Sequence, residues 1–105
     1  MSHNVHLSNH FLHLLLTTSR LQALSLILSA TDEQINALIE IAYNLLSLPL
    51  DEGEKRLINK RRTFLNKLTK KNLSRQNKKQ LIFQHRNILL KTLLYFKDKL
   101  IQLLE

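Results

Sequence analysis

Hydrophobic side chains recur at helical spacing from near the start of this chain. A first apolar run begins at Phe11, and Ser8 stands where its hydroxyl can accept a hydrogen bond from the free amides of a first helical turn. The run is interrupted near residues 17–18, and Ser19 offers another cap for a segment that extends to Leu28. The pattern predicts helix here and leaves open whether it forms one helix or two.

The clearest helix start lies at Thr31, which is followed three residues later by Gln34. In this capping-box pattern the Thr and Gln side chains each accept a hydrogen bond from the other residue's backbone amide. Apolar residues then recur at helical spacing until Pro49, which stops a helix because it lacks an amide hydrogen. The members of this apolar face are Ile35, Leu38, Ile39, Ala42, Leu45 and Leu46.

Two further caps predict the rest of the helical structure. Asp51 and Glu54 repeat the capping pattern and predict a helix of roughly 52–70. Ser74 can cap a last segment, which the apolar pattern allows to continue almost to Glu105.

The composition agrees with this helical pattern. The chain of 105 residues is 44% hydrophobic and contains one Gly and one Pro, too few turn residues for a β architecture. A chain of this length supports one hydrophobic core. We therefore expect an all-α protein, a compact bundle of four or five helices in a single domain of residues 1–105, with residues 1–7 flexible. Apolar runs of at most four residues are too short to span a bilayer, so we expect a soluble protein and disfavour membrane contact.

Charge is divided unevenly along the chain, whose net charge is +8. Residues 1–54 carry one base and six acids, whereas residues 55–79 carry eleven bases and no acid. We call residues 55–79 the cationic stretch. Because helical surfaces normally alternate acids with bases, such a run costs folding free energy and favours an anionic partner.

Nucleic acid is the partner that this charge pattern favours. Phosphate backbones attract dense Lys and Arg through release of condensed counterions, without reading base sequence. An acidic protein surface, an anionic membrane and a merely solvated face remain the alternatives, as does a helix-turn-helix with 52–70 as its second helix. The ten candidate nucleic-acid-binding residues are Lys55, Arg56, Lys60, Arg62, Lys67, Lys70, Lys71, Arg75, Lys78 and Lys79.

Helical periodicity assigns the cations of the 52–70 segment to particular faces of the predicted helix. At 100° per residue its apolar side chains share an arc of about 120°, and Arg56, Lys60, Lys67 and Lys71 share another face. Arg61 alone points into the apolar arc, where it either extends toward solvent, pairs with a carboxylate such as Glu40, or makes an unforeseen contact. The apolar members are Leu57, Ile58, Phe64, Leu65 and Leu68.

Aromatic residues offer little for stacking on unpaired bases. Tyr43 and Tyr95 lie in apolar surroundings of the sequence, and Phe64 and Phe83 fall at core spacing. We therefore expect backbone binding, with duplex DNA as the favoured partner, rather than an exposed aromatic platform.

No enzymatic site is expected. The chain has no cysteine, no Gly-rich phosphate loop and no Ser-His-Asp pattern, and Glu40 is the only carboxylate with a plausible buried setting. His6, His10 and His13 would share a helix face, but neither a carboxylate nor a cysteine accompanies them or His3. We expect no metal, no cofactor and no catalysis.

The segment of residues 81–104 is apolar around most of its predicted helical surface. Core burial, an oligomer interface and membrane contact are the three interpretations, in that order. Because Leu90, Leu94 and Tyr95 widen the apolar face beyond one core, we expect a homo-oligomer that forms through residues 81–104.

From Ala30 onward the sequence resembles small basic proteins of adintovirus and Polinton-type DNA elements, which are similar to adenovirus core proteins. The resemblance covers about half of the chain. Its matching residues are Ala30-Thr31-Asp32 through Ala42-Tyr43-Asn44-Leu45-Leu46, Pro49-Leu50, Lys55-Arg56-Leu57 through Arg61-Arg62-Thr63-Phe64-Leu65, Leu73-Ser74-Arg75, Lys78-Lys79-Gln80-Leu81 and Gln84.

The chain departs from that family after Gln84. Such proteins have a glycine pair and a Pro-containing apolar tail there, whereas this chain continues with His85-Arg86-Asn87 and a helix-forming run. The resemblance thus implies association with DNA as a virion-core type of protein and implies no tail function. It places the protein in the nucleus or the virion if it is viral; otherwise we expect an intracellular protein.

Overall fold

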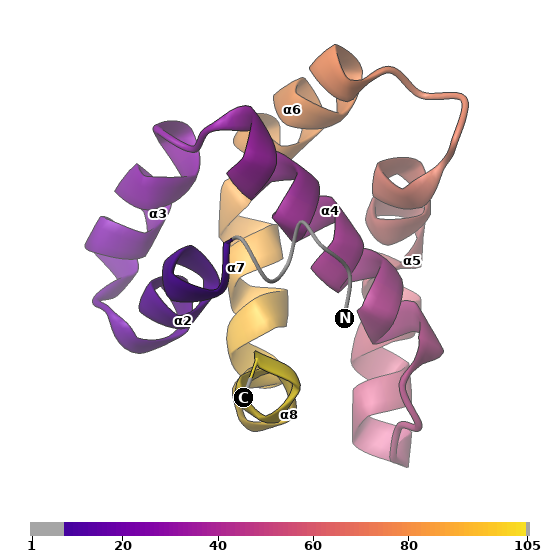
Figure 1. Ribbon diagram of the computed structural model, residues 1–105. Coiled ribbons are helices and arrows are strands. Elements are labelled where there is room, and N and C mark those ends of the chain that lie inside the picture. The colour runs from indigo at the N-terminus through magenta and orange to yellow at the C-terminus, as the bar shows by residue number, and fades with distance from the viewer. Residues whose placement is uncertain (1–7, 105) are drawn as a thin grey trace.

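The computed structural model describes residues 8–104, and it is all-helical over that range (Figure 1). The described part contains seven helices and no strand. They are α2 (Asn9–Thr17), α3 (Arg20–Leu28), α4 (Asp32–Ser47), α5 (Glu52–Thr69), α6 (Arg75–Gln84), α7 (Arg86–Tyr95) and α8 (Lys97–Leu104). The all-α prediction is confirmed, and the predicted flexibility of residues 1–7 lies outside the described residues.

Side-chain caps begin four of these helices where the sequence predicted them. Thr31 and Asp51 each form a complete capping box, at α4 and α5, while Ser19 and Ser74 accept a hydrogen bond from an amide in the first turn of α3 and α6. Ser8 occupies the N-cap position of α2 but makes no side-chain capping bond.

The prediction of four or five helices is wrong, because the chain breaks at more places than its pattern revealed. Residues 8–28 form two helices, and the last segment forms three, with breaks at His85 and Phe96. At each break only the first amide keeps its helical hydrogen bond, since His85 N donates to Leu81 O at 3.0 Å and Phe96 N donates to Thr92 O at 3.4 Å. The i to i−4 bonding is then interrupted, and a new helix begins at Arg86 and at Lys97. Neither Pro nor Gly lies at either break, so the composition gave no sign of them.

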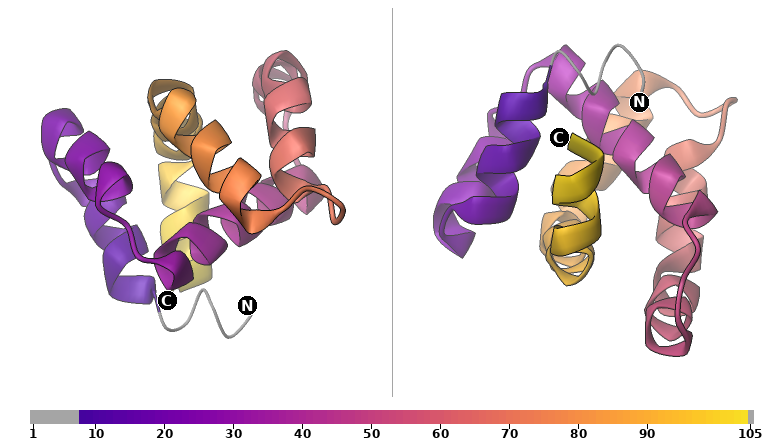
Figure 2. Two further views of the ribbon diagram at one scale, coloured as in Figure 1. Left: turned by 90° about the horizontal axis from the view of Figure 1, so that it is seen from above. Right: turned by 60° about the horizontal axis from the view of Figure 1, so that its bottom comes forward.

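One cluster of buried apolar side chains joins all seven described helices. In both views of Figure 2 and in Figure 1, α7 and α8 lie between the α2–α3 pair and α5. The bend at Phe96 lets α7 contact α3 while α8 contacts α2. Among the largest fully buried side chains are Leu15, Ile27, Ile35, Leu38, Leu45, Ile58, Leu65, Leu68, Ile82, Leu89 and Phe96.

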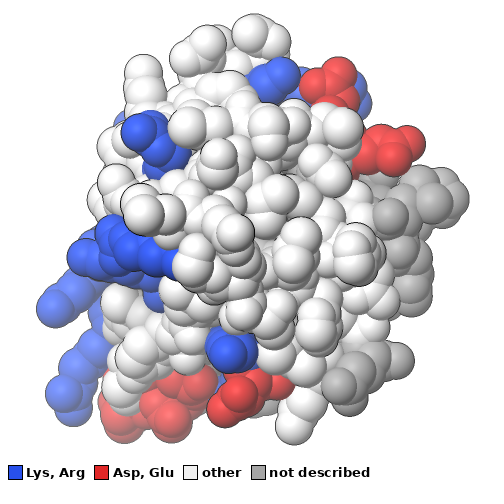
Figure 3. Space-filling model, turned by 90° about the vertical axis from the view of Figure 1, so that its left-hand side faces the viewer, with Lys and Arg blue, Asp and Glu red and all other residues white. Residues whose placement is uncertain are grey.

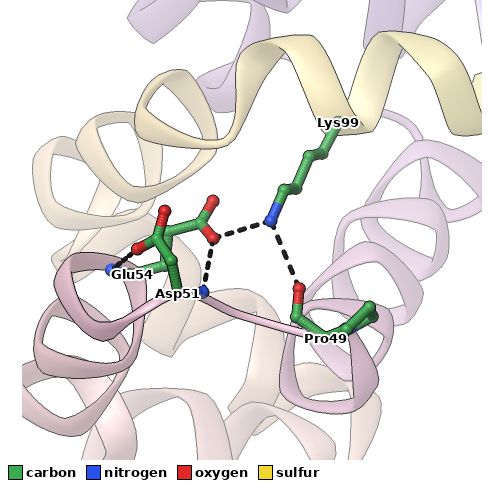
Figure 4. A network of polar contacts seen from close by, with 4 residues as sticks. All are labelled: Pro49, Asp51, Glu54 and Lys99. Carbon is green, nitrogen blue, oxygen red and sulfur yellow. Dashed lines mark hydrogen bonds and ion pairs between the residues drawn. The ribbon is translucent and has the colours of Figure 1, made fainter.

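A polar network fixes the start of α5 against α8 (Figure 4). Lys99 Nζ donates to Glu54 Oε1 at 2.6 Å and to Pro49 O at 3.2 Å. The same Glu54 oxygen accepts from Asp51 N at 3.0 Å, so one carboxylate serves both the capping box and the contact with α8. Glu54 is only 8% exposed, whereas Glu40 is half-buried. The expectation that Glu40 is the only carboxylate with a buried setting is therefore wrong.

None of the helices between residues 8 and 104 combines the length and the apolar character that crossing a membrane requires.

Candidate nucleic-acid interface

Five of the ten predicted nucleic-acid-binding residues lie on α5, and all five are exposed. Arg56, Lys60 and Lys67 share one face of this helix, within about 40° at 100° per residue. Ile58, Leu65 and Leu68 on the other side are buried in the core. Burial of the apolar side thus turns the Arg56 face toward solvent.

The other two candidate residues on α5, Lys55 and Arg62, lie on a different flank of the helix. Both line a groove of about 500 Å³ beside the Pro49 connection between α4 and α5. Arg62 donates from Nε and Nη2 to Asn59 Oδ1, at 3.3 and 3.2 Å. Such a contact holds the guanidinium along the helix surface.

Lys71 does not share the Arg56 face, contrary to the helical-phase prediction. Helix α5 ends at Thr69, and its C-cap Lys70 has an extended backbone with φ −65° and ψ 130°. Both Lys70 and Lys71 are exposed in the turn that leads to α6. The helical phase of α5 therefore does not extend to Lys71.

The last three predicted residues lie at the start of α6, and two of them meet a carboxylate from the acidic half of the chain. Arg75 Nη1 lies 4.0 Å from Asp32 Oδ2, and Lys79 Nζ lies 3.8 Å from Asp32 Oδ1. Lys79 Nζ is also 5.8 Å from the centroid of the Phe83 ring, while Lys78 is half-buried. The cationic stretch contains no acid in the sequence, but the fold places the carboxylate of Asp32 beside two of its cations.

These ion pairs separate the candidate cations into two groups. Lys55 lies 4.0 Å from Glu52, so it joins Arg75 and Lys79 as a cation beside a carboxylate. Exposed pairs of this kind contribute about 0–1 kcal/mol, so they weaken but do not remove the attraction for an anion. Seven candidates lie more than 4.0 Å from any carboxylate among residues 8–104. One of them, Lys78, is half-buried, and the six exposed ones are Arg56, Lys60, Arg62, Lys67, Lys70 and Lys71.

The prediction that the tyrosines lie in apolar surroundings is wrong. Tyr43 is 60% exposed and Tyr95 is 55% exposed. The phase of α4 carried the signal, because Tyr43 falls beside Asn36 and Glu40 rather than on the Ile35 side. Phe64 and Phe83 do pack against the core, as their spacing predicted.

Tyr43 lines a groove of about 460 Å³ between α4 and the α5–α6 turn, and we call it the Tyr43 groove. Arg75 and Lys78 of α6 line the same groove, as do Ile39 of α4 and Leu73 of the turn. In this groove an exposed aromatic ring and two predicted nucleic-acid-binding cations lie together.

Arg61 is half-buried, as its position within the apolar arc of α5 predicted. Its Nε is buried and has no hydrogen-bond acceptor among residues 8–104. The side chain therefore lies partly within the fold, with one donor that has no acceptor in the described part of the structure.

The histidine cluster lies only partly within the described residues. His10 and His13 are exposed on α2, and His3 and His6 lie outside the described range. Between residues 8 and 104, no group of three or more His, Cys, Asp or Glu side chains is arranged to hold a metal ion.

The α2–α3 side of the molecule has a different character (Figure 3). Uncharged surface dominates this view, and Lys and Arg gather toward its edges. Leu21 of α3 is 81% exposed, and Leu14 and Leu28 are exposed as well. The largest exposure of leucine thus occurs on α3 rather than in the C-terminal segment.

The C-terminal segment is buried more deeply than its sequence predicted. Leu90 is 1% exposed and belongs to the core, so it does not extend an external apolar face. The reason is that α7 is central in the fold, where it contacts α3, α6 and α8 (Figure 1). Leu94, Tyr95 and Leu103 remain exposed.

No protein-family model, no curated protein and no solved structure matches this chain.

Proposed function

We propose that this protein is a non-enzymatic nucleic-acid-binding protein that holds the phosphate backbone without reading base sequence. The observation that carries the proposal is the set of six exposed cations on α5 and the following turn that have no carboxylate within 4.0 Å among residues 8–104. Each can contact a phosphate without first losing a carboxylate partner.

The dimensions of α5 suit a phosphate backbone. Arg56 and Lys67 are eleven positions apart, so at 1.5 Å per residue the Arg56 face extends for about 16 Å. Duplex DNA carries one charge per roughly 1.7 Å of its axis when both strands are counted, so that length of duplex carries about nine phosphates, about half of them on each strand. Three cations on one straight face therefore find phosphates within reach whatever the base sequence.

Duplex DNA is the proposed partner, and the net charge of +8 supports condensation as well as binding. The resemblance to virion-core proteins extends the proposal to packaging of a viral or element genome, in the nucleus or the virion.

Titration of the protein against two unrelated duplexes of equal length, at several salt concentrations, tests this function. We expect equal affinities at each salt concentration and a steep linear fall of log K with log salt. A strong preference for one duplex would contradict sequence-independent binding. Absence of binding to either duplex at low salt would refute the function itself.

A second candidate function is a helical interaction module that binds an acidic partner or a second copy of the chain. The exposed leucines on the uncharged α2–α3 side, together with Leu94 and Tyr95, favour a surface for protein contact. Competition between polyglutamate and duplex DNA for the protein distinguishes the two functions. If polyglutamate displaces the duplex only when its charge is in large excess, the result supports nucleic acid as the partner. Equal competition per charge would favour the acidic-protein alternative.

A further inference from the structure

The Tyr43 groove combines features that recognise an unpaired nucleotide. Single-strand binding sites pair a positively charged groove with aromatic rings on which bases stack, and each such stack contributes substantially to affinity for any base. Tyr43 presents an exposed ring, and Arg75 and Lys78 supply two cations in the same groove. Neither the Arg56 face nor the Lys55–Arg62 flank has an aromatic residue among the residues that line it.

The two walls of the groove differ in chemistry, and this difference orients a ligand. The α4 wall contains Tyr43, Ile39 and Glu40, and the opposite wall contains Leu73 of the turn with the α6 cations. A carboxylate repels phosphate but accepts hydrogen bonds from the N–H groups of a base. The base therefore belongs against the α4 wall, and the phosphate belongs against the α6 wall.

Arg75 can serve a phosphate even though it lies near Asp32. The closest approach of the two side chains is 4.0 Å, and both are more than half exposed. An exposed pair of this kind contributes little, whereas a guanidinium binds phosphate bidentately. The volume of about 460 Å³ lies within the range of small-molecule pockets.

We propose that the Tyr43 groove holds one unpaired nucleotide of a nucleic-acid strand, with the base stacked on Tyr43 and the phosphate between Arg75 and Lys78. This site rests on the proposed nucleic-acid binding and adds to it a preference that the Arg56 face cannot supply. The protein then binds duplex through phosphate contacts alone and binds single strands with an additional stacked base.

The chain contains no tryptophan and only two tyrosines. Its intrinsic fluorescence at tyrosine wavelengths therefore comes from Tyr43 and Tyr95, and the emission of Tyr43 reports on this site. Tyr95→Phe leaves Tyr43 as the single tyrosine, and Tyr43→Phe leaves Tyr95 in an equally exposed control position. Titration with oligo(dT) should quench the Tyr43 emission to saturation and leave the Tyr95 emission unchanged. A duplex with the same number of phosphates should quench neither.

Affinity gives a second, independent measurement. Tyr43→Ala should lower the affinity for oligo(dT) about fivefold or more, the lower end of what one base–aromatic stack contributes, and leave the affinity for duplex unchanged. The helical circular dichroism should persist, because the Tyr43 side chain is exposed. Thymidine monophosphate at the same molar concentration should quench far less than oligo(dT); equal quenching would overturn the assignment to a strand and identify a free nucleotide.

The two proposals fail in different ways. If the protein binds duplex with steep salt dependence while oligo(dT) leaves the Tyr43 emission unchanged and Tyr43→Ala has no effect, the nucleotide site is wrong and the proposed function stands. If neither duplex nor oligo(dT) binds, both proposals are wrong.

Discussion

Removal of the three cations on the Arg56 face should weaken duplex binding. The loss of affinity should exceed that caused by removing three cations from outside the candidate interface. The substitutions are Arg56→Gln, Lys60→Gln and Lys67→Gln, which lower the net charge from +8 to +5. Each lost phosphate contact lowers the slope of log K against log salt by about 0.9, so three lost contacts lower it by about 2.7. At 0.1 M salt the same three contacts correspond to a roughly 10²- to 10³-fold loss of affinity.

The matched control removes three exposed cations that lie outside the interface. Arg20→Gln, Lys91→Gln and Lys97→Gln change the net charge by the same amount, and these residues lie on α3, α7 and α8. Lys99 is unsuitable as a control, because it bonds to the buried Glu54 and to Pro49. Arg20 is acceptable, because its hydrogen bond to Asn87 Oδ1, at 3.2 Å, is exposed. We expect the control to change the slope by well under half as much as the Arg56-face variant.

Fluorescence anisotropy with one labelled duplex, measured at four or more salt concentrations, gives both slopes. The Arg56-face variant should fold normally, because its three side chains are exposed and Arg56 and Lys60 repel each other at i and i+4. Circular dichroism and a thermal melt check this. Equal losses of slope in two folded variants would show that only total charge matters and that the Arg56 face is not the contact surface.

Three further predictions concern stability and assembly. Gly53→Ala should stabilise the fold by about 0.4–1 kcal/mol, because an added Cβ would lie 3.4 Å from Tyr95 Oη in ordinary contact; a lower melting temperature would contradict this. Lys99→Met should destabilise the fold by about 1–2 kcal/mol, since it removes a charged hydrogen bond from the buried Glu54 carboxylate, and denaturant unfolding with no change in midpoint would refute that role. Self-association should appear in sedimentation at high micromolar concentration and weaken in Leu94→Gln, whereas a monomer throughout would rule it out.

The sequence by itself determined the features that depend on neighbouring residues. The capping boxes at Thr31 and Asp51 join side chains and amides three residues apart, so a local pattern suffices to place the starts of α4 and α5. The shared face of Arg56, Lys60 and Lys67 follows likewise from helical periodicity. The all-α class follows from the same local preferences together with the scarcity of Gly and Pro.

The candidate interface was only partly predictable for the same reason. The sequence identifies which residues are cationic, but Asp32 is separated by more than forty positions from Arg75 and Lys79, and only packing of α6 near the start of α4 brings them together. The exposure of Tyr43 was available from the phase of α4.

Tertiary structure alone decided which parts of the apolar C-terminal segment are covered. Leu90 is buried and Leu94 is exposed, although both occur in the same apolar run, because α7 is central and packs with only part of its surface. The bond of Lys99 to Glu54 joins residues 45 positions apart. Burial and long-range pairing depend on how the helices are arranged in space, and breaks such as those at His85 and Phe96, which occur without Pro or Gly, set that arrangement without any mark in the local sequence.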